Sequence, residues 1–195
     1  MHDNQNNNIF VKLFDGKTLD GWKMAGKGNF LIIESENALL TYGGMGLLWY
    51  YKKIFKDFIL TLEWKVSNRS DNSGIFVRFP NPFNDPNIAI EYGYEIQIDD
   101  IGLPDGDPIH KTGAIYNYKG SSPKTKYLSK PLVVGKWNTF VIYVIKQYYS
   151  VTLNGEKVVT NFVGNKSLEG FIGLQNHDDR SKVFFRNIMI KELKR

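Results

Sequence analysis

The sequence predicts an all-β protein, built as a two-sheet antiparallel sandwich of the jelly-roll type. Roughly a dozen short runs alternate apolar and polar residues or are rich in β-branched and aromatic residues. Gly, Pro, Asn and Asp separate these runs at short intervals, as in sandwiches and barrels. No amphipathic helix of ten residues or more is found. We therefore expect a disordered polar lead at residues 1–8 and a single domain at 9–195.

In the first half of the chain, the strongest strand signal lies at residues 58–66. Phe58, Leu60, Leu62 and Trp64 alternate with more polar residues, which indicates a strand with one buried face. Leu19-Asp20-Gly21-Trp22 is expected to form a turn, with Trp22 as an anchor in the core. The strands expected before residue 100 lie at 9–14, 30–34, 38–42, 47–51, 58–66, 74–79 and 93–99.

In the second half, Asn154-Gly155 is the clearest hairpin signal, because a type I′ turn needs positive φ at both central residues. Three of the seven prolines fall within residues 80–86 and predict an irregular loop. Further loops are expected at 100–111 and 121–131. The strands expected after residue 100 lie at 112–118, 137–146, 148–153, 157–162, 170–175 and 183–193.

Composition excludes several classes of function. The net charge of +5 is spread along the chain without a nucleic-acid motif, so no nucleic-acid partner is expected. Cysteine is absent, which excludes disulfides, zinc–thiolate sites and a cysteine nucleophile. No apolar run is long enough to span a bilayer. HExxH, GxSxG, P-loop and GxGxxG motifs are absent, which argues against nucleotide cofactors and serine hydrolases.

Residues 93–99, GYEIQID, carry the main functional signal. Glu95, Gln97 and Asp99 fall on one face of a strand, while Ile96 and Ile98 fall on the other. Two acids around an amide favour a ligand-facing strand over a merely solvated one, because binding sites need convergent polar groups on a rigid element.

A set of short motifs resembles one family. In chain order they are Phe14-Asp15-Gly16-Lys17, Leu19, Gly21-Trp22, Asn72-Ser73-Gly74, Phe76, Arg78, Tyr94-Glu95-Ile96-Gln97-Ile98-Asp99, Gly113-Ala114-Ile115-Tyr116, Gly135-Lys136-Trp137-Asn138, Leu153-Asn154-Gly155, Gly173-Leu174-Gln175-Asn176-His177 and Phe185-Arg186-Asn187-Ile188. Over about residues 9–193 they resemble the 3-keto-disaccharide hydrolase family.

The resemblance implies a fold of the concanavalin A-like lectin/glucanase class and action on glycosides that are already oxidised at C3. It also implies a bacterial protein exported to the periplasm or beyond, its leader removed. Residues 1–8 contain no signal peptide, and by themselves they leave a cytoplasmic tail equally open. We expect a carbohydrate as the partner, and the oligomeric state stays open.

A ketone at C3 acidifies the C2 proton, so a base can remove it and the C1 aglycone can leave by β-elimination, with water added afterwards. Direct hydrolysis is the other route. Elimination needs a base and an enolate stabiliser. The base candidates are Glu95, Asp99 and His177. The candidates for substrate binding or enolate stabilisation are Arg78, Gln97, Gln175, Asn72 and Trp49.

Several of these candidate residues could instead have a purely structural role. Arg78 could neutralise Glu95 as an ion pair, and His177 could be a loop residue held by Asp178 or Asp179. Asn72 could only shape its turn, and Trp49 could pack in the core instead of stacking on a sugar.

Hydrolysis by a carboxylate pair is less favoured. On a flat strand Glu95 and Asp99 would lie about 13 Å apart at Cα, beyond the ~5–9.5 Å separation of such pairs.

A divalent cation, Ca²⁺ or another, is a further candidate that no motif establishes. Asp99, Asp100, Asp105 and Asp107 supply oxygens in one loop, and His177 with carboxylates could hold a catalytic ion. The spacing is not that of an EF-hand. The alternative function is a non-catalytic carbohydrate-binding module, which would need stacking aromatics and would tolerate loss of its acids.

Overall fold

The computed structural model describes residues 9–121 and 134–193, and about half of these residues lie in strands. The strand β6 (Phe58–Val66) alternates between buried and half-buried residues along its length, as the sequence predicts. The other strands before residue 100 are β1 (Val11–Lys12), β2 (Trp22–Gly26), β3 (Asn29–Ile33), β4 (Ala38–Tyr42), β5 (Gly46–Tyr50), β7 (Asn72–Phe79) and β8 (Tyr94–Asp99). Those after it are β9 (Asn138–Ile145), β10 (Tyr148–Leu153), β11 (Glu156–Val163), β12 (Phe171–Asn176) and β13 (Val183–Glu192).

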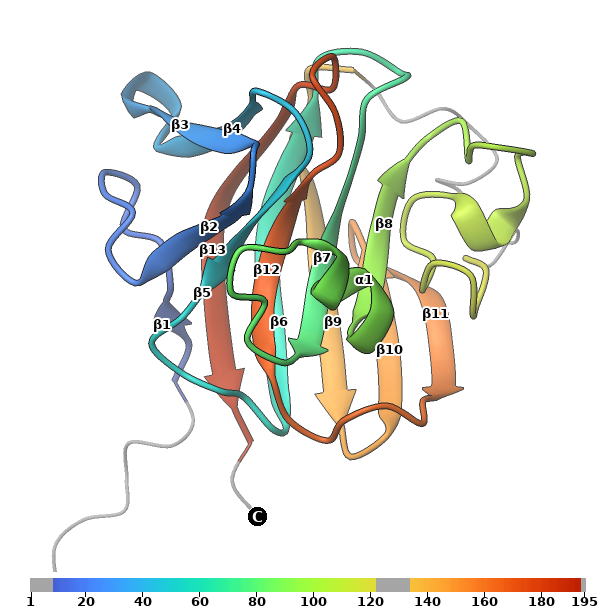
Figure 1. Ribbon diagram of the computed structural model, residues 1–195. Coiled ribbons are helices and arrows are strands. Elements are labelled where there is room, and N and C mark those ends of the chain that lie inside the picture. Colours follow the sequence, from blue (N-terminus) through green and yellow to red (C-terminus); the bar gives the residue numbers. More distant parts are fainter. Residues whose placement is uncertain (1–8, 122–133, 194–195) are drawn as a thin grey trace, which may run out of the picture.

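The strands form two antiparallel sheets packed face to face (Figure 1). The eight-stranded sheet has the order β11-β10-β9-β6-β13-β4-β3, with β1 paired to β13. The five-stranded sheet has the order β2-β5-β12-β7-β8. The predicted all-β, two-sheet antiparallel sandwich is therefore confirmed.

The core lies between the two sheets, where large side chains from both inner faces interlock. Trp64 and Phe140 come from neighbouring strands of the eight-stranded sheet, and their rings lie 5.3 Å apart. Tyr94 comes from β8 of the other sheet and meets Tyr149 at 4.9 Å, edge to face. These rings are buried almost completely, so the core joins the two sheets into one unit.

Helices are few and short. The α-helix α1 (Asn87–Tyr92) lies in front of the five-stranded sheet and packs against β7 and β8 (Figure 1). Two 3₁₀ turns, η1 (Glu34–Glu36) and η2 (Pro108–His110), complete the set in the described part of the chain. None of the helices in that part is both long and apolar enough to cross a membrane.

The Asn154-Gly155 turn between β10 and β11 confirms the predicted hairpin, because φ is 48° at Asn154 and 85° at Gly155. Three predicted boundaries are wrong. Trp22, placed in a turn, begins β2, and the strand expected at 9–14 shrinks to two residues. The strand expected at 112–118 is an irregular segment that touches β8 through an isolated bridge between Ile96 and Ile115. The predicted lead at 1–8 and most of the loop at 121–131 lie outside the described residues.

Candidate active site

The outer face of the five-stranded sheet carries the polar residues of β8. Ile96 and Ile98 enter the core, so Glu95, Gln97 and Asp99 point to the opposite face, as the alternation predicts. All three side chains are nevertheless buried, since they are only 8%, 3% and 1% exposed. Polar side chains on a covered face of this kind are typical of a ligand site rather than of a solvated strand.

Glu95 lies over a glycine. A Cβ added to Gly74 would stand 2.1 Å from Glu95 Oε1, so only glycine leaves room for the carboxyl at this place. Gly74 pairs with Gln97 on β8. On its other side the pairing of Leu174 with Ile75 brings Gln175 of β12 beside it. The carboxyl therefore lies above a gap in the sheet surface, between two glutamines.

The Glu95 carboxyl is not balanced by a positive charge. Among the described residues no Lys, Arg or His forms an ion pair with it; its polar neighbour is Gln97. With its amide nitrogen turned toward the carboxyl, Gln97 donates to Glu95 Oε1 at 3.2 Å and to the Ser73 carbonyl at 3.0 Å. Burial raises the pKa of Glu95 to about 8. The carboxyl can therefore gain or lose a proton near neutral pH.

Several buried polar atoms around this face have no hydrogen-bond partner. They include Trp49 Nε1 on β5, Asn72 Oδ1 on β7 and Gln175 Oε1 on β12. A buried polar atom without a partner costs roughly 1–3 kcal/mol, so several on one face call for an explanation. A bound ligand rich in hydroxyl groups would supply the missing partners.

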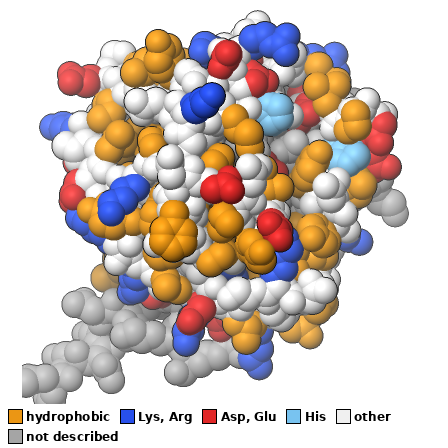
Figure 2. Space-filling view, in the orientation of Figure 1, with side chains coloured by type: hydrophobic (Ala, Val, Ile, Leu, Met, Phe, Trp, Pro, Cys, Tyr) orange, Lys and Arg blue, Asp and Glu red, His pale blue; other side chains and the backbone are white. Residues whose placement is uncertain are grey.

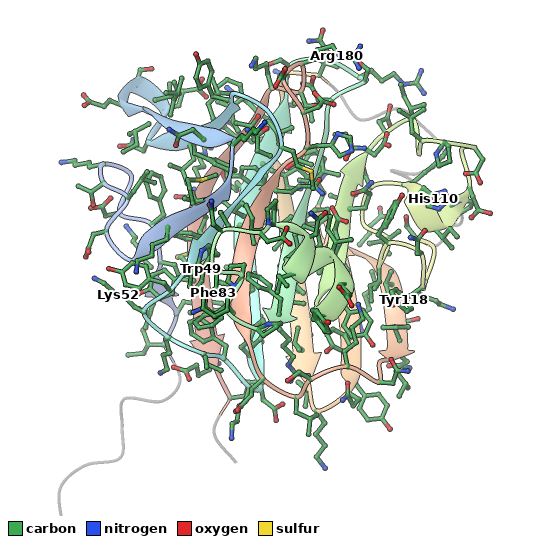
Figure 3. The ribbon with its side chains drawn as sticks, viewed as in Figure 1. Trp49, Lys52, Phe83, His110, Tyr118 and Arg180 are labelled. Carbon is green, nitrogen blue, oxygen red and sulfur yellow. The ribbon has the colours of Figure 1, made fainter. Side chains whose placement is uncertain are left out.

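Trp49 also has a packing role. Its ring meets Phe171 edge to face at 4.8 Å in a small apolar cluster on the outer face, which includes Leu47, Phe76 and Ala89 of α1. Figure 2 shows hydrophobic side chains at the surface on this side of the molecule, and Figure 3 labels Trp49 there. The ring is 5% exposed, so the packing interpretation describes most of its surface, while its N–H stays unpaired.

Asp99 is placed on the same strand, but its oxygens organise a turn. Oδ1 accepts the N–H groups of Ile101 and Gly102 at 2.9 and 2.8 Å, and Oδ2 accepts that of Leu103 at 2.9 Å. Asn72 Nδ2 donates to the same carboxylate at 3.2 Å. These bonds favour Asp99 as a scaffold of the loop after β8 over Asp99 as a base.

Arg78 is not brought to this cluster, contrary to the expectation that it lines the groove. It is 0% exposed and has φ of 58° at an irregularity in β7, which turns its side chain toward the core side of the sheet. Its guanidinium donates to the carbonyls of Lys56 and Lys146 and to Tyr149 Oη, and it pairs with Asp57 at 3.2 Å. The alternative, an ion pair with Glu95, is not formed either, and the bonds of Arg78 tie neighbouring parts of the two sheets together.

His177 follows β12 in an exposed loop, and its side chain is 43% exposed. Nδ1 lies 3.0 Å from Asp178 Oδ2. Burial would raise the pKa of Asp178, but hydrogen bonds from His177, Ser181 and Arg180 lower it to about 2. The structure thus shows the loop arrangement that the sequence left as an alternative, a histidine held by Asp178.

Tyr116 is a residue near the site to which the sequence gave no role. Its N–H donates to the Glu95 carbonyl at 3.0 Å. Burial raises the pKa of Tyr116, and the charges of Glu95 and Asp99 raise it further. His110 packs against its ring at 5.1 Å and is held on both nitrogens, by Asp105 at 2.8 Å and Asn117 at 2.9 Å. In the sequence, the motif Gly113-Ala114-Ile115-Tyr116 was the only hint that Tyr116 has a role. That Tyr116 lies near Glu95 follows from the fold of the loop and could not be predicted.

The acids proposed for a divalent cation do not gather into a site. Asp99 binds backbone amides, Asp105 binds His110, Asp107 accepts the Ile109 N–H, and Asp100 pairs with Arg69. Within residues 9–121 and 134–193, no three His, Asp or Glu side chains are grouped as metal ligands. The described residues therefore show no preformed set of ligands for the candidate cation.

Comparison with known proteins identifies the family of the chain. Residues 10–191 match the model of a family described as "3-keto-alpha-glucoside-1,2-lyase-like domain". A 3-keto-disaccharide hydrolase of Bacteroides thetaiotaomicron is 30% identical over 237 aligned positions, covering 94% of this chain and 78% of that protein.

Two solved structures show the fold alone. A candidate glycosyl hydrolase from Parabacteroides distasonis ATCC 8503 has a TM-score of 0.76 at 24% identity, covering 95% of this chain and 94% of that one. A carbohydrate binding module from Bacillus subtilis has a TM-score of 0.61 at 14% identity, covering 88% and 96%. Both support the predicted lectin-like sandwich. By its match to the family model and to the curated relative, the chain belongs to the family of 3-keto-alpha-glucoside-1,2-lyase-like domains.

Proposed function

We propose that the protein cleaves the glycosidic bond of 3-keto-glycosides, with Glu95 as the base that removes the C2 proton. Membership of the family supports a glycoside-cleaving enzyme. The name of the relative, a 3-keto-disaccharide hydrolase, supports a 3-keto-disaccharide as substrate. The description of the family as lyase-like supports elimination as the route.

One observation carries the proposal. Glu95 is a buried carboxyl without a counter-ion, its pKa is raised to about 8, and it lies on a face with unpartnered polar atoms. A general base works best when its pKa lies near the working pH, and burial is the usual means of raising a carboxyl to that range. Structural carboxylates, such as Asp99 here, are instead bonded by several donors.

Elimination takes two steps, and the addition of water is the third. Ionised Glu95 takes the proton from C2, and the electron pair of that bond becomes the enolate of the C3 ketone. The enolate then forms the C1=C2 double bond and expels the aglycone oxygen from C1. Protonated Glu95 can return its proton to that oxygen, so the carboxylate is regenerated. Water added across the double bond completes the net hydrolysis.

Donors near Glu95 can stabilise the enolate oxygen. The Gln97 amide nitrogen donates to Glu95 Oε1, and Gln175 lies beside Gly74 on β12. Trp49 Nε1 is a further buried donor without a partner on the same face, three strands away from β8. Donors fixed in a water-poor site stabilise developing charge without reorganising, which makes them more effective than water. Asn72 Oδ1 is an unpartnered acceptor that can take a hydroxyl of the sugar.

The test is turnover of 3-keto-trehalose and of a 3-keto-glucoside, beside the unoxidised sugars. We expect aglycone release from the keto forms alone. Glu95→Gln, which keeps size and loses the charge, should lower kcat by about 100-fold or more. Asp105→Asn is the control, because Asp105 lies at the exposed end of the neighbouring loop. Sugar binding without turnover in the unaltered protein would contradict the proposal and favour a binding module.

The route of cleavage is read from the C2–H bond. Elimination breaks this bond, so a substrate deuterated at C2 should react more slowly, and the C1=C2 enone should accumulate transiently. Direct hydrolysis leaves the bond intact and predicts equal rates for the two substrates. The same assays with and without chelator test the candidate cation, and turnover that chelator abolishes would show that one takes part.

The pH dependence follows from the sign of the shift. The base must be ionised, and the pKa of Glu95 is about 8. We expect kcat/KM to rise by about tenfold per pH unit below that pKa and to level off above it. A profile that falls through the same range would instead identify Glu95 as an acid.

A further inference from the structure

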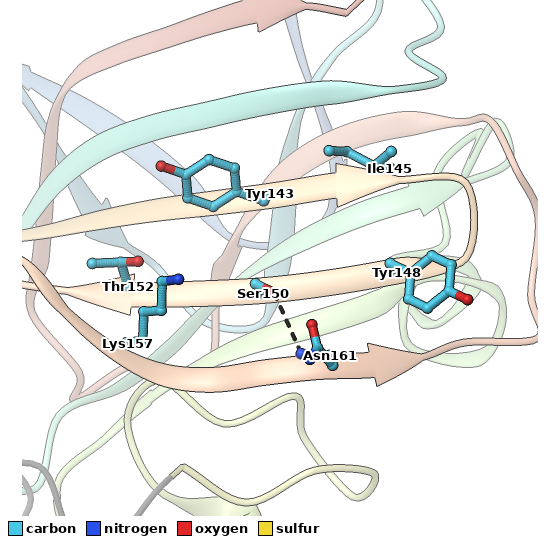
Figure 4. A pocket seen from close by; sticks show the side chains of 7 residues that line it. All are labelled: Tyr143, Ile145, Tyr148, Ser150, Thr152, Lys157 and Asn161. Atoms are coloured by element: carbon cyan, nitrogen blue, oxygen red, sulfur yellow. Dashed lines mark hydrogen bonds between the residues drawn. The ribbon is translucent and has the colours of Figure 1, made fainter.

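The opposite side of the sandwich carries a hollow of its own. It lies on the outer face of the eight-stranded sheet, across β9, β10 and β11, and has a volume of about 460 Å³ (Figure 4). This is within the range of small-ligand sites, roughly 300–1,000 Å³. The residues that line it are Tyr143, Ile145, Tyr148, Ser150, Thr152, Lys157 and Asn161.

Side-chain length explains the shape of the hollow. The short hydroxyl residues Ser150 and Thr152 lie in the middle strand, β10, and form its floor. Ser150 pairs with Tyr143 on one side, and Thr152 pairs with Lys157 on the other. Tyr148 closes one end of the floor (Figure 4). Long side chains thus surround short ones on a sheet face that would otherwise be even.

An irregularity between β10 and β11 contributes to the hollow. Between the pairs Tyr149–Phe162 and Val151–Val159, β10 advances two residues while β11 advances three. Such bulges bend the strand and redirect its side chains. Asn161 lies in this stretch with φ of 54°, and its N–H approaches Ser150 Oγ at 3.4 Å. The bulge therefore brings the Asn161 amide to the rim.

The side chains that line the hollow are of the types that bind sugars. Tyr143 and Tyr148 are 37% and 55% exposed, and each offers an apolar ring with a polar tip. They occupy diagonal positions of neighbouring strands, about 7–8 Å apart at Cα, which suits adjacent sugar rings. Hydroxyl, amide and ammonium groups in the same lining can bond sugar hydroxyls.

We propose that this hollow is a second, non-catalytic glycan site that binds two or three pyranose units of an oligosaccharide. The hollow and Glu95 lie on opposite outer faces of the sandwich. Binding of a glycan in the hollow therefore does not require turnover at Glu95. A protein partner fits less well, because a stable protein interface needs about 800 Å² on each side and its centre is depleted of lysine. Here Lys157 lines the hollow itself.

The probes are cellohexaose, maltohexaose and laminarihexaose, each titrated into the full chain by NMR. We expect at least one to bind in the millimolar range or tighter. The double change Tyr143→Ala and Tyr148→Ala should weaken that binding by about tenfold or more. Tyr42→Ala is the matched control, since Tyr42 is 54% exposed on the same sheet and does not line the hollow. The double variant should keep its turnover of a 3-keto-disaccharide.

Several results would overturn the proposal. One is that none of the three probes binds. Another is that Tyr42→Ala weakens binding as much as the double change. A third is that Trp49→Phe abolishes binding while the double change does not, which would place the probe at the Glu95 face. A shift of the double variant from dimer to monomer on gel filtration, with unchanged probe binding, would identify the hollow as a protein interface.

Discussion

Glu95 and Gly74 form one structural unit. The carboxyl occupies the space that a side chain at position 74 would take. Shape and electrostatics are therefore linked, because the glycine lets the carboxyl lie flat on the sheet and the sheet keeps water from it. The effects on stability of substitutions at positions 74 and 95 should therefore be non-additive.

Gly74→Ala should displace the Glu95 carboxyl, because the new Cβ would stand 2.1 Å from Oε1. We expect a loss of stability of about 1–3 kcal/mol, typical of overpacking, and a large fall in kcat. The measurement is urea unfolding with steady-state kinetics. In a Glu95→Asp background the shorter side chain retreats from the glycine, so the same change should cost clearly less. Equal costs in both backgrounds would show that the two residues are independent.

Residue types and alternation predicted part of the candidate site. Glu95 and Gln97 reach one face because β8 is regular, and regular strands obey the period of two. The role of Asp99 could not be predicted in this way, because its partners are the amides of Ile101, Gly102 and Leu103. Those amides converge only once the loop after β8 has folded.

At the scale of elements, β7 is the strand whose shape was hardest to foresee. Strict alternation along β7 would place Arg78 opposite Val77, on the face of Phe76. The positive φ of Arg78 and the register shift beside Phe171 reverse that placement. A single bulged residue moves a side chain from one face to the other, and alternation alone contains no sign of it. By contrast, β6 has no bulge in its pairing with β9, and its burial follows the sequence directly.

Arg78→Met should destabilise the protein by about 3–5 kcal/mol, because it removes a buried cation that bonds Lys56, Lys146 and Tyr149 and pairs with Asp57. Urea unfolding measures the loss. Arg69→Met is the matched control: the Arg69 side chain is 59% exposed in its pair with Asp100, so its loss should cost about 1 kcal/mol or less. Equally small losses would refute the view that Arg78 ties the strands together.

For the molecule as a whole, Glu95 links stability to pH. Its pKa is about 8 in the folded protein, against an ordinary value of 4.5. Below pH 4.5 the carboxyl is protonated in both states and has no effect. Between 4.5 and 8 the unfolded chain releases the proton while the folded protein keeps it. The free energy of unfolding therefore falls as the pH rises, by at most about 1.4 kcal/mol per pH unit.

Glu95→Gln removes this dependence. We expect the variant to gain stability relative to the unaltered protein as the pH rises from 4.5 to 8, with the difference levelling off above that range. Urea unfolding of both proteins at a series of pH values gives the difference, and other ionisable groups cancel in the comparison. A difference that is constant with pH would contradict the raised pKa.

The irregular segment beside β8 has a consequence for the behaviour of the protein in concentrated solution. Residues 112–116 bond the outward-facing backbone groups of the strand: Gln97 through both its N–H and its carbonyl, and the carbonyls of Glu95 and Asp99. The Asp99 N–H donates to Thr112 Oγ1. A strand whose outer hydrogen bonds are already made cannot template another chain. The β8 edge of the five-stranded sheet, which carries Glu95, is thereby protected from amyloid-like stacking, although no regular strand pairs with it on that side.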